Sequence, residues 1–138
     1  ILEIGIYHGF SLLLWREYFP NAHVYGLDID PNRLINEPWL DRLTSIQCDQ
    51  GSEVSLRAAA TRVGGGIDFI CDDASHIPSH QVLTAQVLAP LLAPDGFYAI
   101  EDIEDPSIME RLPLPSRLIN FDLSVAHYNR LIVMGGKQ

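Results

Sequence analysis

The 138-residue sequence is short of positive charge and has no long hydrophobic run. Nine Lys and Arg residues stand against 18 Asp and Glu residues, which gives a formal net charge of −9. A chain with this charge is a poor partner for the phosphate backbone of a nucleic acid or for an anionic membrane surface, so we expect neither. No apolar run approaches the roughly 20 residues that a membrane-spanning helix needs.

Cysteine is also scarce, and the chain contains only Cys48 and Cys71. Their positions do not form a metal-binding or redox motif. We expect two buried free thiols, which fits a reducing, cytoplasmic setting.

The composition that remains is that of an ordinary globular protein, with 47% hydrophobic and 20% charged residues. The length suffices for one compact domain with one core, which we place at residues 1–138. The first residue is not Met and already belongs to an apolar run, so we expect that a segment before this run is missing.

Short apolar runs alternate with segments of helical periodicity along the chain. Helix signals include Ser52 as a cap with Glu53 in the first turn, and Pro78 at a helix start. Helices are predicted at 10–18, 52–63 and 78–93, and strands at 1–4, 24–28, 43–47, 67–71, 97–100, 117–123 and 130–134.

This alternation predicts an α/β fold, a single Rossmann-like three-layer sandwich whose sheet is mostly parallel. The last two strands have no helix between them, so we expect a C-terminal antiparallel strand pair. Ligands of open α/β sheets bind outside the carboxyl ends of the strands. Every candidate site residue below lies at such an end.

Acids and glycines at successive strand ends indicate a nucleotide-type cofactor site. The segment from Glu3 to Gly9 (EIGIYHG) joins an acid to two glycines, which permit a tight turn and a close approach of ligand to backbone. Asp28 ends the second strand, where an acid can accept hydrogen bonds from ribose hydroxyls. Asp49 and Gln50 end the third, where an adenine edge could be read. Taken singly, each acid is also typical of a turn.

A second cluster consists of Asp73 and His76 after the fourth strand and Glu101-Asp102 after the fifth. Strands joined by one helix are commonly neighbours, roughly 5 Å apart, so the three carboxylates can share one ion. Three hard oxygen ligands with open positions suit Mg²⁺. His76 lies at the start of the next helix and can act as a general base, because an imidazole exchanges protons near neutral pH.

Structural alternatives exist for the members of this cluster. Asp73 and Ser75 could cap the following helix, and Glu101-Asp102 could form a solvated loop. His76 and His80 are spaced i, i+4, which could indicate Zn²⁺, but no third soft ligand accompanies them. His8 is interpreted as a loop residue that could instead line the pocket, and His80 as a surface or interface residue. His127 is placed in the loop of the last strand pair, where it could touch substrate.

Taken together, the strand-end motifs resemble the class I S-adenosylmethionine-dependent methyltransferases. The matching motifs are EIGIYHG at 3–9, GLDIDP at 26–31, CDQ at 48–50 and the strand that ends at Asp72. In that family the glycine turn faces the methionine part of the cofactor, and the acids after the second and third strands hold its ribose and adenine. The resemblance implies eight cofactor-binding residues: Glu3, Gly5, Tyr7, Gly9, Asp28, Asp49, Gln50 and Asp72.

The order Asp-Asp-x-Ser-His followed by Glu-Asp is similar to the metal-dependent sugar O-methyltransferases of macrolide antibiotic pathways (the mycinamicin type). This resemblance implies Mg²⁺ ligands at Asp73, Glu101 and Asp102, and His76 as the catalytic base. It also implies that the metal orients a substrate diol and acidifies the hydroxyl to be methylated. Ala74 stands where that family usually has glycine, which removes no ligand.

The expected function is S-adenosylmethionine-dependent and Mg²⁺-dependent O-methylation of a small-molecule hydroxyl, on a sugar or natural-product diol. One alternative is a non-catalytic or truncated S-adenosylmethionine-binding module, which detectable methyl transfer would exclude. Another is a nicotinamide-dependent oxidoreductase, but Tyr7 and Phe10 stand where its G-x-G-x-x-G fingerprint requires glycine. The sequence leaves open the identity of the acceptor and whether the chain forms a homo-oligomer.

Overall fold

The computed structural model describes residues 1–31, 41–121 and 130–135 of the chain. Its strands are β1 (Leu2–Ile4), β2 (Val24–Asp28), β3 (Leu43–Gln47), β4 (Ile67–Asp72), β5 (Leu92–Ile100), β6 (Ser116–Asn120) and β7 (Arg130–Gly135). Its helices are α1 (Phe10–Tyr18), α2 (Glu53–Val63) and α3 (Pro78–Leu88), with short 3-10 helices η2 (Ala89–Leu91) and η3 (Pro106–Arg111). In this part of the chain no helix has the length and apolar composition that a bilayer crossing requires.

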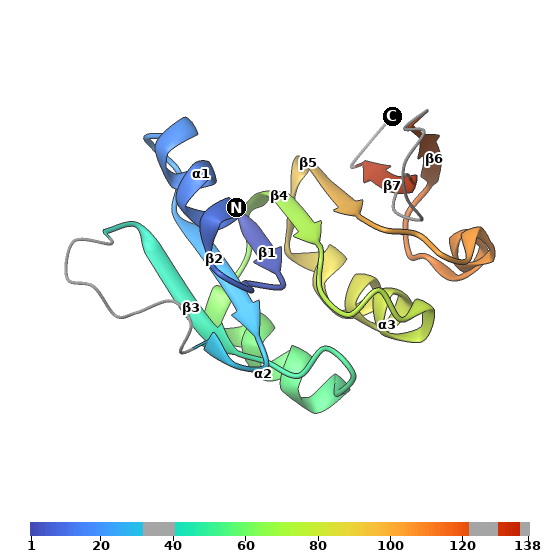
Figure 1. Cartoon of the computed structure of the whole chain (residues 1–138), viewed down its shortest axis with the longest axis horizontal. Coiled ribbons are helices and arrows are strands. Elements are labelled where there is room, and N and C mark those ends of the chain that lie inside the picture. The colour runs from blue at the N-terminus through green and yellow to red at the C-terminus, as the bar shows by residue number, and fades with distance from the viewer. Residues whose placement is uncertain (32–40, 122–129, 136–138) are drawn as a thin grey trace.

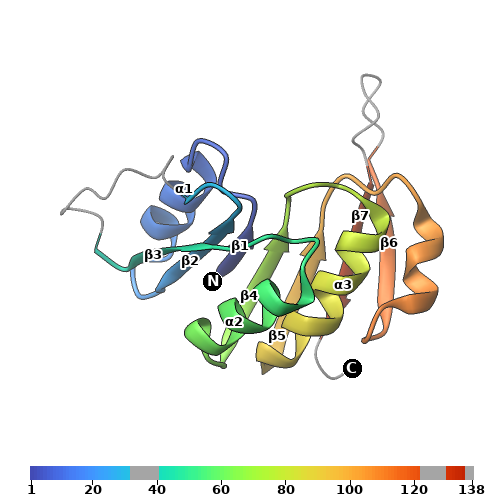
Figure 2. The ribbon, with the colours of Figure 1, turned by 90° about the horizontal axis from the view of Figure 1, so that it is seen from below.

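The described strands form one seven-stranded sheet in the order β3-β2-β1-β4-β5-β7-β6 (Figure 1). Strands β1 to β5 are parallel, whereas β7 is antiparallel to both β5 and β6. Figure 2 shows α1 on one side of the sheet and α2 and α3 on the other. This arrangement confirms the predicted Rossmann-like sandwich, with its mostly parallel sheet and its C-terminal antiparallel pair.

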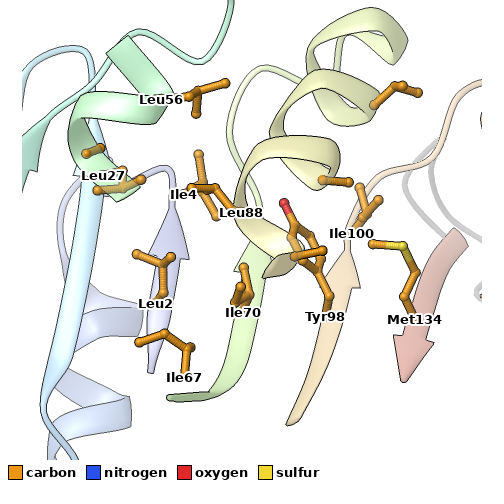
Figure 3. Close-up of a cluster of buried hydrophobic side chains, with 14 of the residues drawn as sticks. Leu2, Ile4, Leu27, Leu56, Ile67, Ile70, Leu88, Tyr98, Ile100 and Met134 are labelled. Atoms are coloured by element: carbon orange, nitrogen blue, oxygen red, sulfur yellow. The ribbon is translucent and has the colours of Figure 1, made fainter. Parts of the chain in front are cut away.

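Two apolar layers hold the helices against the sheet. In the larger layer, Leu56 of α2 and Leu88 of α3 pack with Tyr98 and other buried side chains of the parallel strands (Figure 3). In the smaller layer, Leu12 of α1 packs with Val24 of β2. Each fully buried aliphatic side chain contributes roughly 1.5–3 kcal/mol relative to exposure, so burial on both faces keeps the strand ends in fixed positions.

The helix signals in the sequence act as predicted. The Ser52 side chain accepts a hydrogen bond from the Ser55 backbone N–H at 3.3 Å and caps α2. Gly64, with φ 83°, follows the last residue of this helix. Pro78 occupies the first turn of α3, where its missing N–H costs nothing.

The boundary between α3 and β5 differs from the prediction. The helix ends at Leu88 rather than at residue 93, because Pro90 cannot continue an α-helix and lies in η2 instead. Strand β5 then begins at Leu92, five residues earlier than the predicted 97. Its register shifts, since Ile67 pairs with Leu92 but Phe69 pairs with Phe97, and this bulge accommodates the proline and glycine between them.

The predicted strand at 117–123 is observed as Ser116–Asn120. Residues 122 and 123, and the predicted loop residue His127, lie outside the described residues. The acidic segment that follows β5, for which no element was predicted, contains η3, where the Asp105 carboxylate accepts a hydrogen bond from the Ser107 N–H at 3.0 Å.

Candidate functional site

The predicted site residues lie along one edge of the sheet, at the carboxyl ends of β1 to β5. The register aligns Ile4 of β1 with Leu27 of β2 and with Asp72 of β4, and Asp72 with Ile100 of β5. The ladder continues one residue further, because the Asp73 N–H donates to the Ile4 carbonyl at 2.9 Å. The segments that follow these strands therefore start from one row.

A cavity of about 430 Å³ opens at this edge, a volume within the range of small-ligand sites. Five of the eight predicted cofactor-binding residues line it: Gly5, Tyr7, Asp28, Asp49 and Gln50. The other three, Glu3, Gly9 and Asp72, do not belong to its lining.

Asp28 organises the turn that follows β1. One carboxylate oxygen, Oδ2, accepts hydrogen bonds from the backbone N–H groups of Ile6 at 2.7 Å and of Tyr7 at 3.2 Å. The other oxygen, Oδ1, accepts from the Asp30 N–H at 2.9 Å. Asp28 thus holds the turn in the shape that lines the cavity, a role additional to any contact with a ligand.

Gly5 brings the same turn against the segment after β4. Its φ is +97°, and a Cβ atom added there would lie 2.2 Å from the Asp73 carbonyl oxygen. Both the left-handed conformation and the contact distance therefore require glycine. The close approach places the first turn and Asp73 side by side at the cavity.

We expect Gly5→Ala to lower the free energy of unfolding by about 3 kcal/mol, because backbone strain and a backbone clash add together. Gly66→Ala is the matched control, since Gly66 has φ +76° but no atom within 4 Å of an added Cβ. That control should lose only about 1 kcal/mol. Urea unfolding monitored by circular dichroism measures both, and equal losses would contradict the close contact.

The side chain of Glu3 points into the protein and connects β1 to α1 through hydrogen bonds. It is buried, and its carboxylate accepts hydrogen bonds from the Ser11 hydroxyl and from the Trp15 indole N–H, the latter at 2.5 Å. Burial raises the pKa of Glu3, while the two hydrogen bonds lower it. Gly9, with φ 77°, precedes the first residue of the same helix. Both residues shape the start of α1.

Asp72 lies beneath the cavity in a buried polar network. Its Oδ1 accepts a hydrogen bond from Gln50 Nε2 at 2.7 Å, and Tyr98 Oη lies 3.5 Å from Oδ2. Burial raises the pKa of Asp72 to about 7, although these hydrogen bonds oppose the shift. Asp72 therefore determines where Gln50 lies in the cavity wall.

Because the pKa of Asp72 is raised, we expect the free energy of unfolding to decrease as pH rises. A carboxyl with pKa about 7 when folded and 3.8 ordinarily binds its proton more tightly in the folded state. Protonated Asp72 therefore contributes roughly 2–4 kcal/mol to the free energy of unfolding below about pH 4. This contribution is lost as pH rises to about 7. Urea unfolding at pH 5 and pH 8 in EDTA should show this decline, and Asp72→Asn should reduce it.

Asn at position 72 keeps an oxygen that accepts the hydrogen bond from Gln50, so the network is retained. The exposed Asp95 gives the matched control, Asp95→Asn, which should leave the pH dependence unchanged. An unaltered decline in the Asp72→Asn protein would show that other carboxyls cause it.

Three predicted residues form a group of suitable size for a metal ion. One ligand atom from each of Asp73, His76 and Asp102 lies within 4.8 Å of the others, and His76 Nε2 is 3.7 Å from Asp102 Oδ2. Desolvation first, and then repulsion from Glu101, raise the pKa of Asp73 to about 6, while His76 lowers it and Asp102 raises it. A cation would relieve this crowding of negative charge, so the donor set fits a metal such as Mg²⁺.

The third predicted metal ligand, Glu101, lies outside this group of three. Its carboxylate Oε1 is 3.5 Å from the Cys71 thiol. Burial and the nearby Glu101 raise the pKa of Cys71, so this thiol stays protonated. The electrostatic influence of Glu101 on Asp73 nevertheless keeps it in the surroundings of the candidate metal group.

Residues with strained backbone conformations lie at the same edge of the sheet. Four non-glycine residues in the described part of the chain have a positive φ, and three of them belong to this site: Tyr7 at 48°, His76 at 55° and Asp102 at 52°. Such conformations persist only where the surroundings enforce them, and they are typical of functional sites. The backbone conformation of these three residues is therefore imposed by the fold.

His80 is the main residue that the sequence analysis misplaced. It was interpreted as a surface or interface residue, but it lines the cavity and is half-buried. Ser75 lines the cavity as well, and its hydroxyl lies 3.0 Å from His80 Nδ1. The sequence signal was the position of both residues close to the start of α3, directly after the strand end that carries Asp73.

A family model described as a methyltransferase domain matches residues 2–103. The chain is 40% identical over 111 residues to the 8-demethyl-8-alpha-L-rhamnosyl tetracenomycin-C 2'-O-methyltransferase of Streptomyces olivaceus, which covers 75% of this chain and 28% of that protein. It is 36% identical over 110 residues to the mycinamicin VI 2''-O-methyltransferase of Micromonospora griseorubida, covering 75% of this chain and 27% of that protein.

A solved structure with a similar fold is the MycE methyltransferase from the mycinamycin biosynthetic pathway, in complex with Mg, SAH and mycinamycin VI. Its TM-score is 0.71 at 30% sequence identity, over 99% of this chain and 44% of that chain. This chain thus spans 27–28% of the length of the two curated relatives above.

Proposed function

The chain belongs to the methyltransferase domain family, and from this premise we propose that it forms the catalytic core of an S-adenosylmethionine-dependent O-methyltransferase. The proposal rests on Asp73, because this residue belongs to two features of the site. This residue lines the cavity and is also a member of the candidate metal group with His76 and Asp102. A ligand cavity and a set of acceptor-activating side chains therefore meet at one strand end.

The cavity residues suit the cofactor that this family implies. S-adenosylmethionine carries its activated methyl group on a sulfonium, which can be transferred to a nucleophilic oxygen. The turn at Gly5 and Tyr7 permits a close approach of ligand to backbone, and Asp28 presents carboxylate oxygens for hydroxyl groups. Asp49 and Gln50 lie at the end of β3, where the base of a nucleoside would be held.

The residues beside the acceptor would hold a metal ion and take up the proton of the hydroxyl group. Asp73 and Asp102 would hold Mg²⁺ together with Glu101, and the bound ion supplies Lewis acidity toward a substrate hydroxyl. We assign His76 the role of general base, which takes up the hydroxyl proton at an imidazole nitrogen. The like charges around Asp73 support the metal, and the strained φ of His76 supports a functional placement.

We propose a sugar hydroxyl of a natural product as the methyl acceptor. The relatives from Streptomyces olivaceus and Micromonospora griseorubida are O-methyltransferases named for a rhamnosyl tetracenomycin and for mycinamicin VI. A diol acceptor is consistent with the charge of the site, because a neutral or cationic ligand is tolerated better than an anion beside several carboxylates. The two free cysteines, both buried, support the proposal of a reducing, cytoplasmic setting.

Two measurements on the purified chain test the proposal. Isothermal titration calorimetry should show binding of S-adenosylhomocysteine, and NAD⁺ titrated as a control should not bind. Incubation with Mg²⁺, S-adenosylmethionine and a panel of glycosylated diols should give methylated product by mass spectrometry. Cofactor binding without product across the panel would favour the alternative of a non-catalytic binding module.

A further inference from the structure

A chain of hydrogen bonds connects His80 to the buried Asp72. Gln50 Nε2 donates to Asp72 Oδ1 at 2.7 Å, and Gln50 Oε1 accepts from both the backbone N–H and the hydroxyl of Ser75, at 3.1 and 2.7 Å. The Ser75 hydroxyl oxygen lies 3.0 Å from His80 Nδ1. Gln50, Ser75 and His80 all line the cavity, so the chain runs along its wall.

The backbone N–H of Ser75 determines which groups donate and which accept in this series of hydrogen bonds. The Ser75 N–H can only donate, so the atom of the Gln50 amide that faces it must be the oxygen. That oxygen carries no hydrogen, so the hydrogen in the short contact between it and the Ser75 hydroxyl belongs to Ser75. The serine oxygen is then left to accept from His80, which makes Nδ1 the protonated nitrogen of the neutral imidazole.

The second ring nitrogen of His80 is consequently an acceptor in the cavity wall. A Cβ atom added to Gly51 would lie 2.9 Å from His80 Nε2, so this nitrogen lies directly against the Gly51 backbone. Gly51 follows β3 and lines the same cavity. The absence of a side chain at Gly51 leaves room for the imidazole at this end.

His80 lies at the end of the cavity formed by the segment after β3, because a Cβ atom added to Gly51 would lie 2.9 Å from His80 Nε2 and 3.4 Å from Asp49 Oδ1. Apolar side chains line the cavity beside it, among them Leu27, Ile29 and Cys48. A flat heterocycle with a polar edge is the ligand part that such a wall fits.

On the basis of the function proposed above, we propose that His80 is a specificity-determining residue that accepts a hydrogen bond from the exocyclic amino group of the cofactor's adenine. The proposed function places the base of the cofactor at Asp49 and Gln50, and His80 lies against Gly51, the next residue along the chain. Hypoxanthine has a carbonyl in place of the amino group, and this carbonyl would face the lone pair of His80 Nε2. The site therefore selects adenine over hypoxanthine.

Binding constants measured by calorimetry test the proposal without any turnover. The wild-type chain should bind S-adenosylhomocysteine about 10- to 100-fold more tightly than S-inosylhomocysteine. In His80→Ala this ratio should fall to about threefold or less, mainly because S-adenosylhomocysteine binds more weakly. His23→Ala is the control, since His23 is an exposed histidine that contacts Thr44, and it should keep the wild-type ratio.

Nitrogen-15 NMR of labelled histidine provides a second readout. His80 of the free protein at neutral pH should show a protonated Nδ1 and an unprotonated Nε2, and Ser75→Ala should shift this tautomer balance. A ratio unchanged in His80→Ala, or a protonated Nε2 in the free protein, would overturn the assignment of His80 alone. No binding of S-adenosylhomocysteine by the wild type would overturn the proposed function and this inference with it.

Discussion

Replacing His76 with alanine is expected to lower the rate of methyl transfer about 1000-fold, within the range that general bases contribute. The affinity for S-adenosylhomocysteine should stay within about twofold of the wild-type value, because His76 belongs to the metal group and does not line the cavity. Initial rates at saturating S-adenosylmethionine, together with calorimetric Kd values, measure both quantities.

Two further variants make this result interpretable. His76 has φ 55°, so His76→Asn tests loss of the imidazole with a residue that tolerates the left-handed conformation. His23→Ala removes an imidazole at the opposite end of β2 and should keep full activity. Saturating Mg²⁺ should not rescue either His76 variant, whereas rescue would make His76 a metal ligand rather than the base. Wild-type turnover in both variants would remove His76 from the mechanism.

Removal of divalent metal is expected to abolish methyl transfer, with a loss of at least about 1000-fold that added Mg²⁺ reverses. The physical reason is that burial, and then the like charges of Glu101 and Asp102, raise the pKa of Asp73 to about 6, and a bound cation would offset those charges. Without a cation this arrangement is strained by like charges and cannot polarise a hydroxyl. Activity measured against Mg²⁺ concentration after EDTA treatment tests the requirement.

The variant Asp102→Asn tests whether the requirement for divalent metal arises at the group of Asp73, His76 and Asp102. It should weaken Mg²⁺ binding at least about tenfold in calorimetry, since one anionic ligand becomes neutral. Asp95→Asn changes an exposed acid near the start of β5, and should leave Mg²⁺ affinity unchanged. Full activity in EDTA would exclude the metal, and equal effects of the two substitutions would indicate a general charge effect.

Prediction from the sequence succeeded where the signal was local. Apolar runs bounded by turns identified β2, β3 and β4 closely, and the cap at Ser52 and the proline at residue 78 identified the starts of α2 and α3. The end of α3 was wrong because its periodicity continues past Pro90, and β5 was begun too late because the bulge around Gly96 depends on pairing with β4. Pairing between distant segments leaves no periodic signal.

The sequence by itself determined which residues stand at the carboxyl ends of the parallel strands, and hence at one edge of the sheet. Alternation of strands and helices is sufficient for this, since it dictates the direction of each strand. Only the tertiary structure decided where the side chains turn. Glu3 points to Ser11 and Trp15, Asp72 points to Gln50, and His80 enters the cavity wall through Ser75. These directions depend on partners far away in the sequence, because a buried polar group must lie where another element offers it a hydrogen bond.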